Sequence, residues 1–309
     1  MSGLSGFLSG DAKANRPIAT KVTVAMMMLV RFMIQAFLKN NEDSANIVQN
    51  CAIFAPVKSL EQIILPITAE LTQFEAFFGQ TLRAETEPMD SIMRYVLDTQ
   101  GKRLRPVLVL LGAKMFGEVN EKTLRAATFV EMVHSATLIH DDVVDDSDSR
   151  RKKASVKARF SNLSAVLAGD YLLAKAMLLI ANDTDILNEM LRTTAAMSEG
   201  ELMQNQNQSN YIDIITRKTA LLMQSCCAAG ALSVNASPEQ VQQIADFGLN
   251  FGILFQLRDD ILDGENTEQA KALLPIYYER TMKTLKGFVP SEIVDTLCDL
   301  TVFCAERTE

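Results

Sequence analysis

Five aspartates fall within eight positions of the stretch His134–Arg151, which reads HSATLIHDDVVDDSDSRR. Asp141 and Asp145 are four residues apart, so on a helix they lie on the same face, one turn from each other. Carboxylates at that spacing repel each other unless a cation lies between them. Mg²⁺ takes carboxylate oxygens and completes its shell with water and substrate phosphates. Acidic helix ends are usually just solvated, but the apolar run before this one predicts a buried helix whose acids face a cleft.

A second acidic cluster repeats this spacing more than a hundred residues later, in FGLNFGILFQLRDDILDGE. Asp259, Asp260 and Asp263 close an apolar helical run, as the first cluster does. One such motif is weak evidence, whereas two at the ends of hydrophobic helices are hard to explain as surface decoration. Two facing clusters could hold several metal ions, and those ions could hold a diphosphate.

A basic segment, Gly101–Pro106 (GKRLRP), precedes a third apolar run. Lysine and arginine at a helix start oppose the helix dipole, so their placement needs a reason. A phosphate ligand supplies one, because helix N-termini bind anions and arginine adds bidentate hydrogen bonds. The alternative is a basic turn that stays in water.

With these motifs in this order, the chain resembles the trans-isoprenyl diphosphate synthases, also called polyprenyl synthetases, from about Ser59 to Pro275. It is most similar to the synthases of medium and long chains. The family's first motif is GKR-x-RP, which Gly101–Pro106 matches. The resemblance implies a fold, a reaction and a role for each matched residue.

By this resemblance, the site for isopentenyl diphosphate comprises Lys102, Arg103, Arg105, His134 and Arg151. The site for the allylic diphosphate comprises Arg150, Lys218, Thr219 and Gln256, with Lys271 in a remnant of the family's last conserved segment. Several Mg²⁺ ions are expected on Asp141, Asp145 and Asp259, with Asp142, Asp260 and Asp263 in support. Asp141, Asp145, Arg150, Lys218 and Asp259 are the expected catalytic residues, and His140 is expected to be structural.

The implied reaction joins isopentenyl diphosphate to an allylic diphosphate, such as farnesyl diphosphate, and releases diphosphate. The metal ions stabilise the charge of the departing diphosphate, and apolar helices keep water from the allylic cation. The growing chain is expected to pass Thr137, Ala136, Val133 and Val130, which form roughly one stripe before Asp141. Small residues at 136 and 137 favour a product longer than farnesyl, unless Phe129 or Met132 blocks the tunnel or the stripe is simply core.

The elements that must position these residues are predicted to be helices. Glycine and proline are scarce, with 14 and 8 residues, and tryptophan is absent. Helical periodicity begins at Ser59, Pro66 predicts a break, and Ser237 and Pro238 are expected as N-cap and first helical residue. Helices are expected near 89–99, 103–116, 121–145, 162–181, 184–205, 210–233, 238–263 and 273–286. We expect an all-α fold, a single large helical bundle around a central cleft.

We expect an extension at 1–55 and the polyprenyl synthetase domain at 56–309. Val22–Leu38 is apolar but interrupted by Arg31, which favours an amphipathic surface segment in peripheral contact with a membrane, or sequence upstream of the true start, over an export signal or anchor. The net charge of −8 argues against a nucleic-acid surface. The five cysteines lack zinc spacing and indicate a reducing compartment, so we expect a cytoplasmic protein.

The chain departs from the family after Asp263, where a loop of about a dozen residues is missing. Lys157 also stands where many relatives have asparagine. A second hypothesis is therefore a catalytically weak or inactive partner subunit that binds prenyl diphosphates. The retained motifs favour the enzyme, expected as a homodimer like its relatives. A class I terpene cyclase ranks last, because such enzymes lack the GKR segment.

Overall fold

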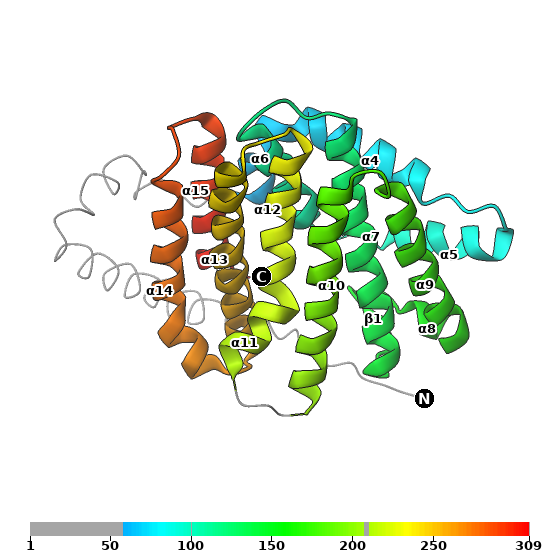
Figure 1. Ribbon diagram of the computed structural model, residues 1–309. Helices are drawn as coiled ribbons and strands as arrows, with labels where there is room; N and C mark the ends of the chain where they lie inside the picture. Colours follow the sequence, from blue (N-terminus) through cyan, green and yellow to red (C-terminus); the bar gives the residue numbers. More distant parts are fainter. Residues whose placement is uncertain (1–57, 100, 207–209, 309) are drawn as a thin grey trace, which may run out of the picture. The chain divides into compact units, whose positions relative to one another are not determined.

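The computed structural model describes residues 58–99, 101–206 and 210–308 (Figure 1). Residues Val57–Glu309 form one compact unit. The predicted extension at 1–55, with its apolar segment Val22–Leu38, lies outside the described residues.

The described part is built of helices, and the expectation of an all-α bundle is confirmed. In chain order they are α3 (Leu60–Ile63), the 3₁₀ turn η2 (Leu65–Ile67), α4 (Thr68–Thr81), α5 (Glu87–Asp98), α6 (Leu104–Lys114), α7 (Glu121–Val144), α8 (Val156–Arg159), α9 (Asn162–Leu179), α10 (Thr184–Asn205), α11 (Tyr211–Ile215), the π turn η3 (Thr216–Ala220), α12 (Leu221–Ser233), α13 (Pro238–Asp263), α14 (Thr267–Leu285) and α15 (Glu292–Glu306). Between α7 and α8, the strands β1 (Ser149–Arg150) and β2 (Lys153–Ala154) form an antiparallel hairpin.

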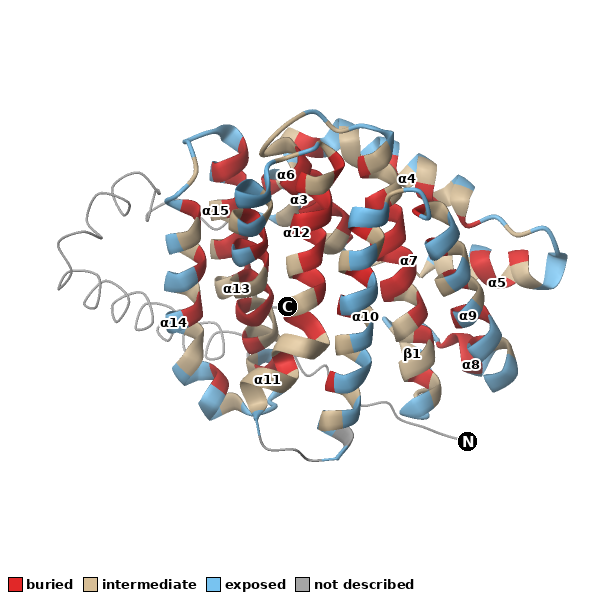
Figure 2. Ribbon diagram, in the orientation of Figure 1, coloured by how far each residue is buried: buried red, intermediate tan, exposed pale blue. Residues whose placement is uncertain are grey.

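The core lies around α12, which is buried on nearly all sides and packs between α6 and α13 (Figure 2). Glycine lets α6 and α12 approach closely: a Cβ on Gly230 would lie 2.2 Å from the carbonyl oxygen of Val109. Cys226 and Cys227 are buried in this core, as expected. Fully burying one leucine, isoleucine or phenylalanine side chain contributes about 1.5 to 3 kcal/mol, so this apolar centre dominates the stability of the bundle.

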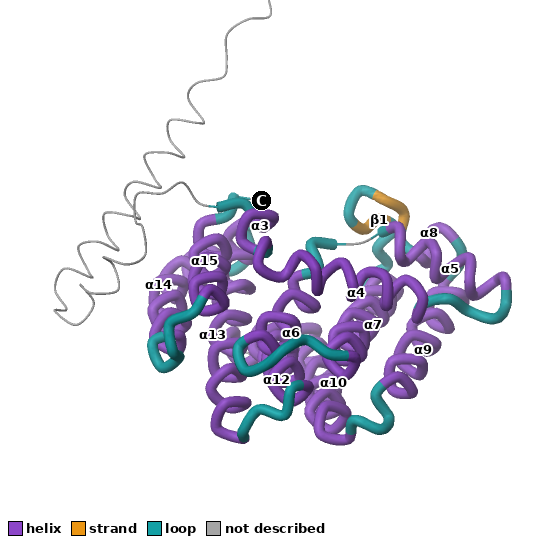
Figure 3. The backbone as a smooth tube through the Cα atoms, turned by 90° about the horizontal axis from the view of Figure 1, so that it is seen from above, coloured by secondary structure: helices purple, strands orange, loops and turns teal. Residues whose placement is uncertain are grey.

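The two helices that carry the acidic motifs are long and well capped. Asn120 forms a capping box with Thr123 at the start of α7, and Ser237 forms one with Gln240 at the start of α13. Pro238 is the first residue of α13, as predicted. In Figure 1, α7, α10, α12 and α13 run side by side, and Figure 3 views the same bundle from above. The acidic motifs lie at the C-terminal ends of α7 and α13, at the same end of the bundle.

Several boundaries differ from the predictions. Pro66 breaks the first helix as expected, by forcing the 3₁₀ turn η2. The helix predicted at 210–233 is divided by the π turn η3, and α14 begins at Thr267 and continues through Pro275. The hairpin and α15 were not predicted, because two-residue strands give no alternation and α15 lies beyond the family motifs.

Candidate active site

The first acidic motif lies on the last turn of α7. Asp141 is half-buried, and Asp145 caps the helix by donating its backbone N–H to the Asp141 carbonyl oxygen at 2.8 Å. Burial, and after it the negative charge of Glu201 on α10, raises the pKa of Asp141 to about 6. The last turn of α7 therefore lies among carboxylates whose negative charge Lys218 and Arg150 only partly offset. That is an environment suited to an added cation.

The second aspartate of each motif is turned away and held by protein donors. Asp142 is 2% exposed, and its Oδ1 accepts a hydrogen bond from Arg150 Nε and forms an ion pair with Arg150 Nη2, both at 2.9 Å. Asp260 is 6% exposed and accepts from Tyr211 Oη at 2.5 Å and Gln256 Nε2 at 2.7 Å. Burial raises the pKa of Asp142, partly offset by Arg150. Their supporting role at the metal stays a prediction, and these bonds show them fixing helix ends and neighbours.

Asp259 and Asp263 are the remaining acids of the second motif. Asp259 accepts a hydrogen bond from Arg307 Nη2 at 2.5 Å, and burial raises the pKa of Asp259 against the lowering effect of Arg307. Asp263 is exposed at the last residue of α13. Gly264, in the left-handed region with φ of 80°, ends α13. The connection to α14, which begins at Thr267, is therefore only Gly264–Asn266.

The π turn η3 presents Lys218 and Thr219 to opposite neighbours. Lys218 Nζ forms an ion pair with Glu201 Oε2 and donates a hydrogen bond to Gln204 Oε1 on α10, both at 2.8 Å. Thr219 Oγ1 donates to Gln256 Oε1 on α13 at 2.7 Å. Because Gln256 in turn donates to Asp260, this turn connects the surroundings of both acidic motifs. Widened π turns of this kind are frequent at functional sites.

The basic segment Gly101–Pro106, which leads into the first turn of α6, contains one exposed and two enclosed cations. Lys102 is exposed, whereas Arg105 is half-buried and its Nε has no hydrogen-bond partner among the described residues. Burial lowers the pKa of Arg105. A buried guanidinium N–H without a hydrogen-bond partner is consistent with an anion-binding role. Its charge also lowers the pKa of His134, after the larger effect of burial, so that imidazole is neutral.

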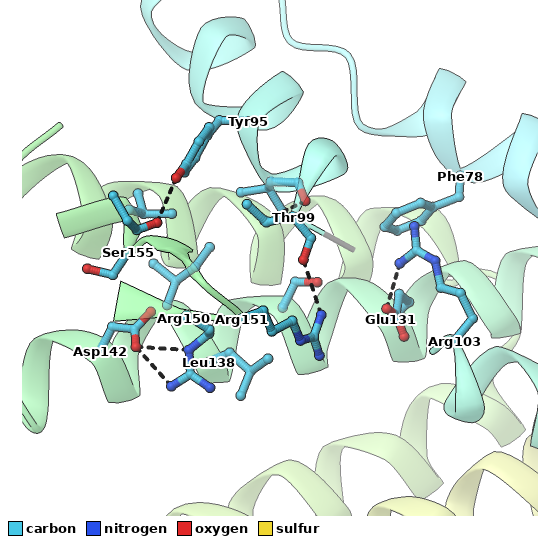
Figure 4. Close-up of a pocket in the computed structure, with 15 residues that line it drawn as sticks. Phe78, Tyr95, Thr99, Arg103, Glu131, Leu138, Asp142, Arg150, Arg151 and Ser155 are labelled. Atoms are coloured by element: carbon cyan, nitrogen blue, oxygen red, sulfur yellow. Dashed lines mark hydrogen bonds and ion pairs between the residues drawn. The ribbon is translucent and has the colours of Figure 1, made fainter. Parts of the chain in front are cut away.

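Arg103 is engaged differently from its neighbours. It is 8% exposed in a left-handed conformation, donates to Glu131 at 2.6 Å and Glu75 at 2.8 Å, and lies over the Phe78 ring at 4.6 Å (Figure 4). The guanidinium expected to bind substrate thus already donates its hydrogen bonds to two carboxylates. Substrate contact by Arg103 remains a prediction, and the contacts present anchor the segment to α4 and α7.

The β1–β2 hairpin brings two further arginines close to the basic segment Gly101–Pro106. Arg150 leaves β1 towards Asp142, and Arg151 donates to the Thr99 carbonyl oxygen at 3.2 Å (Figure 4). A Cβ on Gly101 would lie 2.5 Å from the Arg151 guanidinium, so this glycine makes room for it. Arg150, Arg151, Arg103 and Glu131 line a cavity of about 50 Å³ beneath the hairpin. Burial lowers the pKa of Arg151.

Lys157, at the position noted as a departure, clamps the turn between α7 and the hairpin. Its buried ammonium pairs with Asp146 and, at 3.3 Å, with Asp148. The hydrogen bonds to both aspartates raise the pKa of Lys157. Asp146 and Asp148 are therefore paired with Lys157, which leaves Asp141 and Asp145 as the acids of the first cluster available to a metal ion.

Divalent metal ions fit this donor set only together with a substrate. Asp141, Asp145, Asp259 and Asp263 supply the hard oxygen ligands that Mg²⁺ prefers. Among the described residues, no three His, Cys, Asp or Glu side chains are grouped closely enough to hold an ion by themselves. Mg²⁺ usually keeps waters and takes phosphate oxygens, so a site built from one or two carboxylates and a diphosphate is consistent with both observations.

The other predicted residues lie in two kinds of place. Lys271 is exposed on α14 and pairs with Glu268 at 3.3 Å. Ala136, Val133 and Val130 are buried in the core, and Thr137 is half-buried and donates to the His134 carbonyl oxygen. Lining of a chain-length tunnel by these residues stays a prediction. Tyr211 and Arg307 were missed, because each reaches its aspartate from 48 or 49 residues away and no motif marks it.

Comparison with known proteins adds an independent finding. The family model described as Polyprenyl synthetase matches residues 86–272. Octaprenyl diphosphate synthase of Escherichia coli is 30% identical over 241 residues, 71% of this chain and 75% of that protein. Octaprenyl diphosphate synthase of Haemophilus influenzae is 37% identical over 185 residues, 57% of this chain and 56% of that protein. Heptaprenyl diphosphate synthase component 2 of Geobacillus stearothermophilus is 32% identical, covering 72% and 76%.

Solved structures share the fold. A polyprenyl synthase from Caulobacter crescentus, complexed with calcium and isoprenyl diphosphate, has a TM-score of 0.74 at 24% identity and covers 82% of this chain and 100% of its own. A geranylgeranyl pyrophosphate synthase from Bacteroides thetaiotaomicron has a TM-score of 0.68 at 29% identity, covering 81% and 99%.

Proposed function

The chain belongs to the polyprenyl synthetase family, and from this premise we propose that it condenses isopentenyl diphosphate with an allylic diphosphate to form a longer trans-polyprenyl diphosphate. One observation carries the proposal. The π turn η3 connects to Glu201 beside Asp141 through Lys218, and to Gln256 and Asp260 through Thr219. Cationic and hydroxyl donors thus lie between two acidic helix ends, the arrangement that a metal-bound diphosphate needs.

Each group of residues has a task in this reaction. Lys218 and Arg150 bind the allylic diphosphate, and Lys102, Arg105 and Arg151 bind the diphosphate of isopentenyl diphosphate. His134 is neutral, so it contributes a hydrogen bond without adding a charge. Mg²⁺ bound to the carboxylates of Asp141, Asp145 and Asp259 supplies electrostatic stabilisation of the leaving diphosphate. The double bond of isopentenyl diphosphate then attacks the allylic carbon, and the proton lost passes to the released diphosphate.

A product of medium or long chain is supported by both the relatives and the residues before Asp141. The three relatives compared above by sequence are octaprenyl and heptaprenyl diphosphate synthases. Thr137 and Ala136 are small, so neither closes a path along α7 as an aromatic ring would. Farnesyl diphosphate is the proposed primer.

The test is incubation of the purified full chain with Mg²⁺, isopentenyl diphosphate and farnesyl diphosphate, with released diphosphate and product length both measured. Asp145→Ala removes an exposed cleft carboxylate and is expected to abolish turnover. Asp246→Ala is the matched control, because Asp246 is also an exposed aspartate but lies in the N-terminal half of α13, away from the second acidic motif. This variant is expected to retain turnover. A folded wild-type protein that yields no polyprenyl product would contradict the proposal.

A second candidate is a partner subunit with little or no turnover of its own. The observation in its favour is the short connection Gly264–Asn266 after the second motif, where the longer loop of the family is missing. One relative is named as a component of a synthase. Diphosphate binding without turnover, with turnover restored by a second polypeptide, would favour this candidate.

A second copy of this chain is the proposed partner. Helix α9 buries Ala165, Ala168 and Leu172 against α7 but leaves Leu163 70%, Leu167 51% and Leu178 78% exposed. By length and composition α9 is the one described helix apolar enough to cross a membrane, but one face of it, made mostly of small residues, is buried against α7. An exposed apolar stripe of this kind marks an interaction site.

Light scattering after size exclusion tests this partner. Leu167→Glu is expected to convert a dimer to a monomer, whereas Val289→Glu, at a position 84% exposed elsewhere, leaves it unchanged. A monomeric wild-type protein would contradict the proposal.

We also propose a cytoplasmic location, supported by the free, buried thiols of Cys226 and Cys227.

A further inference from the structure

The segment that follows α15 folds back onto the second acidic motif. Arg307 comes directly after Glu306, the last residue of α15, and its Nη2 donates to Asp259 Oδ1 at 2.5 Å. No sequence motif marks Arg307, and the proposed reaction gives it no task. Its contact is nevertheless with an acid expected to hold metal.

Arg307 is anchored independently of Asp259. Its guanidinium lies 4.2 Å from the centroid of the Phe255 ring and donates to the Phe255 carbonyl oxygen at 3.3 Å. Arg258 grips the backbone carbonyl oxygen of Arg307 through Nε at 2.8 Å and also through Nη2. The Arg307 side chain is only 9% exposed. Because Phe255 holds the guanidinium and Arg258 holds the backbone, the Arg307 side chain is fixed in place and is unsuited to moving away from Asp259.

Among the described residues, Asp259 is held by a hydrogen bond through one carboxylate oxygen only. Oδ1 takes the Arg307 bond, and the side chain remains 31% exposed, so part of the carboxylate faces solvent. A carboxylate fixed through one oxygen presents the other in a single orientation. Groups that hydrogen-bond a metal ligand in this way fix its geometry, and their loss typically weakens metal binding about 10- to 100-fold.

We propose that Arg307 is a positioning residue, which orients Asp259 for the metal-diphosphate site by holding one carboxylate oxygen. The proposal rests on the metal role of Asp259 in the proposed function. Arg258 acts through the backbone of Arg307, so the two arginines and Phe255 form one support. The opposite role, a guanidinium that competes with the metal for Asp259, predicts the opposite change in metal affinity.

The experiment measures binding of Mn²⁺ to the full chain in the presence of inorganic diphosphate, by the loss of the free-ion paramagnetic resonance signal. Arg307→Met keeps a side chain that packs on Phe255 but removes the donors. It is expected to weaken Mn²⁺ binding about 10-fold or more. Arg280→Ala is the matched control, because Arg280 also lies over an aromatic ring, Tyr277 at 4.9 Å, but is exposed on α14. It is expected to leave the affinity unchanged.

A second variant keeps the inference testable if Arg307→Met folds poorly. Arg258→Gln leaves the Asp259 contact in place but releases the backbone of Arg307, and it is expected to weaken Mn²⁺ binding in the same direction. Equal affinities in wild type and Arg307→Met, or tighter binding in Arg307→Met, would overturn the inference. A wild-type chain that shows the expected binding pattern but makes no product would overturn the proposed function and still support the positioning role.

Discussion

Replacing Asp141 by asparagine is expected to stabilise the metal-free protein while removing its activity. The pKa of this carboxyl is about 6 in the folded protein against an ordinary value of 3.8. Between these values the unfolded chain has lost a proton that the folded protein retains, so raising the pH favours unfolding. The carboxylate is thus a source of instability above pH 6, and no such effect exists below about pH 4.

The size of this effect follows from the shift. A rise of about two pKa units corresponds to about 3 kcal/mol between the protonation states. Asp141 is only half-buried, so solvent screening reduces the expected gain to about 1 to 2 kcal/mol. In a domain of this size, that raises the melting temperature by about 2 to 8 °C.

Urea unfolding in the presence of a chelator, at pH 4.5, 6 and 7.5, measures the free energy of unfolding of wild type and Asp141→Asn. The difference between them should be greatest at pH 7.5 and fall towards zero at pH 4.5. Asp145→Asn, exposed in the same motif, is the control and should change the free energy by less than about 0.5 kcal/mol. A gain independent of pH, or an equal gain in the control, would refute the reasoning.

Three further variants test separate parts of the site. Thr137→Phe, at a half-buried position, should shorten the products separated by chromatography, and unchanged product length would remove residue 137 from the chain-length path. Gly101→Ala places a Cβ 2.5 Å from the Arg151 guanidinium, so KM for isopentenyl diphosphate should rise about 10-fold with little change in KM for the allylic substrate; equal changes in both would contradict this. Tyr211→Phe removes a donor from buried Asp260 and should cost about 1 to 3 kcal/mol in urea unfolding, and an unchanged midpoint would count against the network.

The sequence could predict the features that depend on neighbours along the chain. The ends of α7 and α13 follow from apolar periodicity and caps, so the placement of Asp141 and Asp259 at helix ends was accessible. The sequence could not predict that the side chains of Asp142 and Asp260 turn into the protein. Their direction depends on Arg150, in a hairpin that was not predicted, and on Tyr211.

Other features depend on contacts between distant segments. Arg103 matches a family motif, yet its donors are taken by Glu75 and Glu131, 28 residues away on either side. The contact between Arg307 and Asp259 is set by how α15 packs against α13. Spacing along the chain carries no signal for either, since folding brings these side chains together only after the helices have packed.

The π turn η3 also constrains how this segment can evolve. A π turn contains one residue more than an α-helical turn, so it behaves as a fixed insertion in the register between α11 and α12. Substitutions at Thr216 or Ala220 preserve that register. A one-residue deletion would rotate one flank by about 100°, and either Tyr211 would leave Asp260 or Lys218 would leave Glu201. Descendants of this sequence can therefore vary here by exchange of side chains far more readily than by change of length.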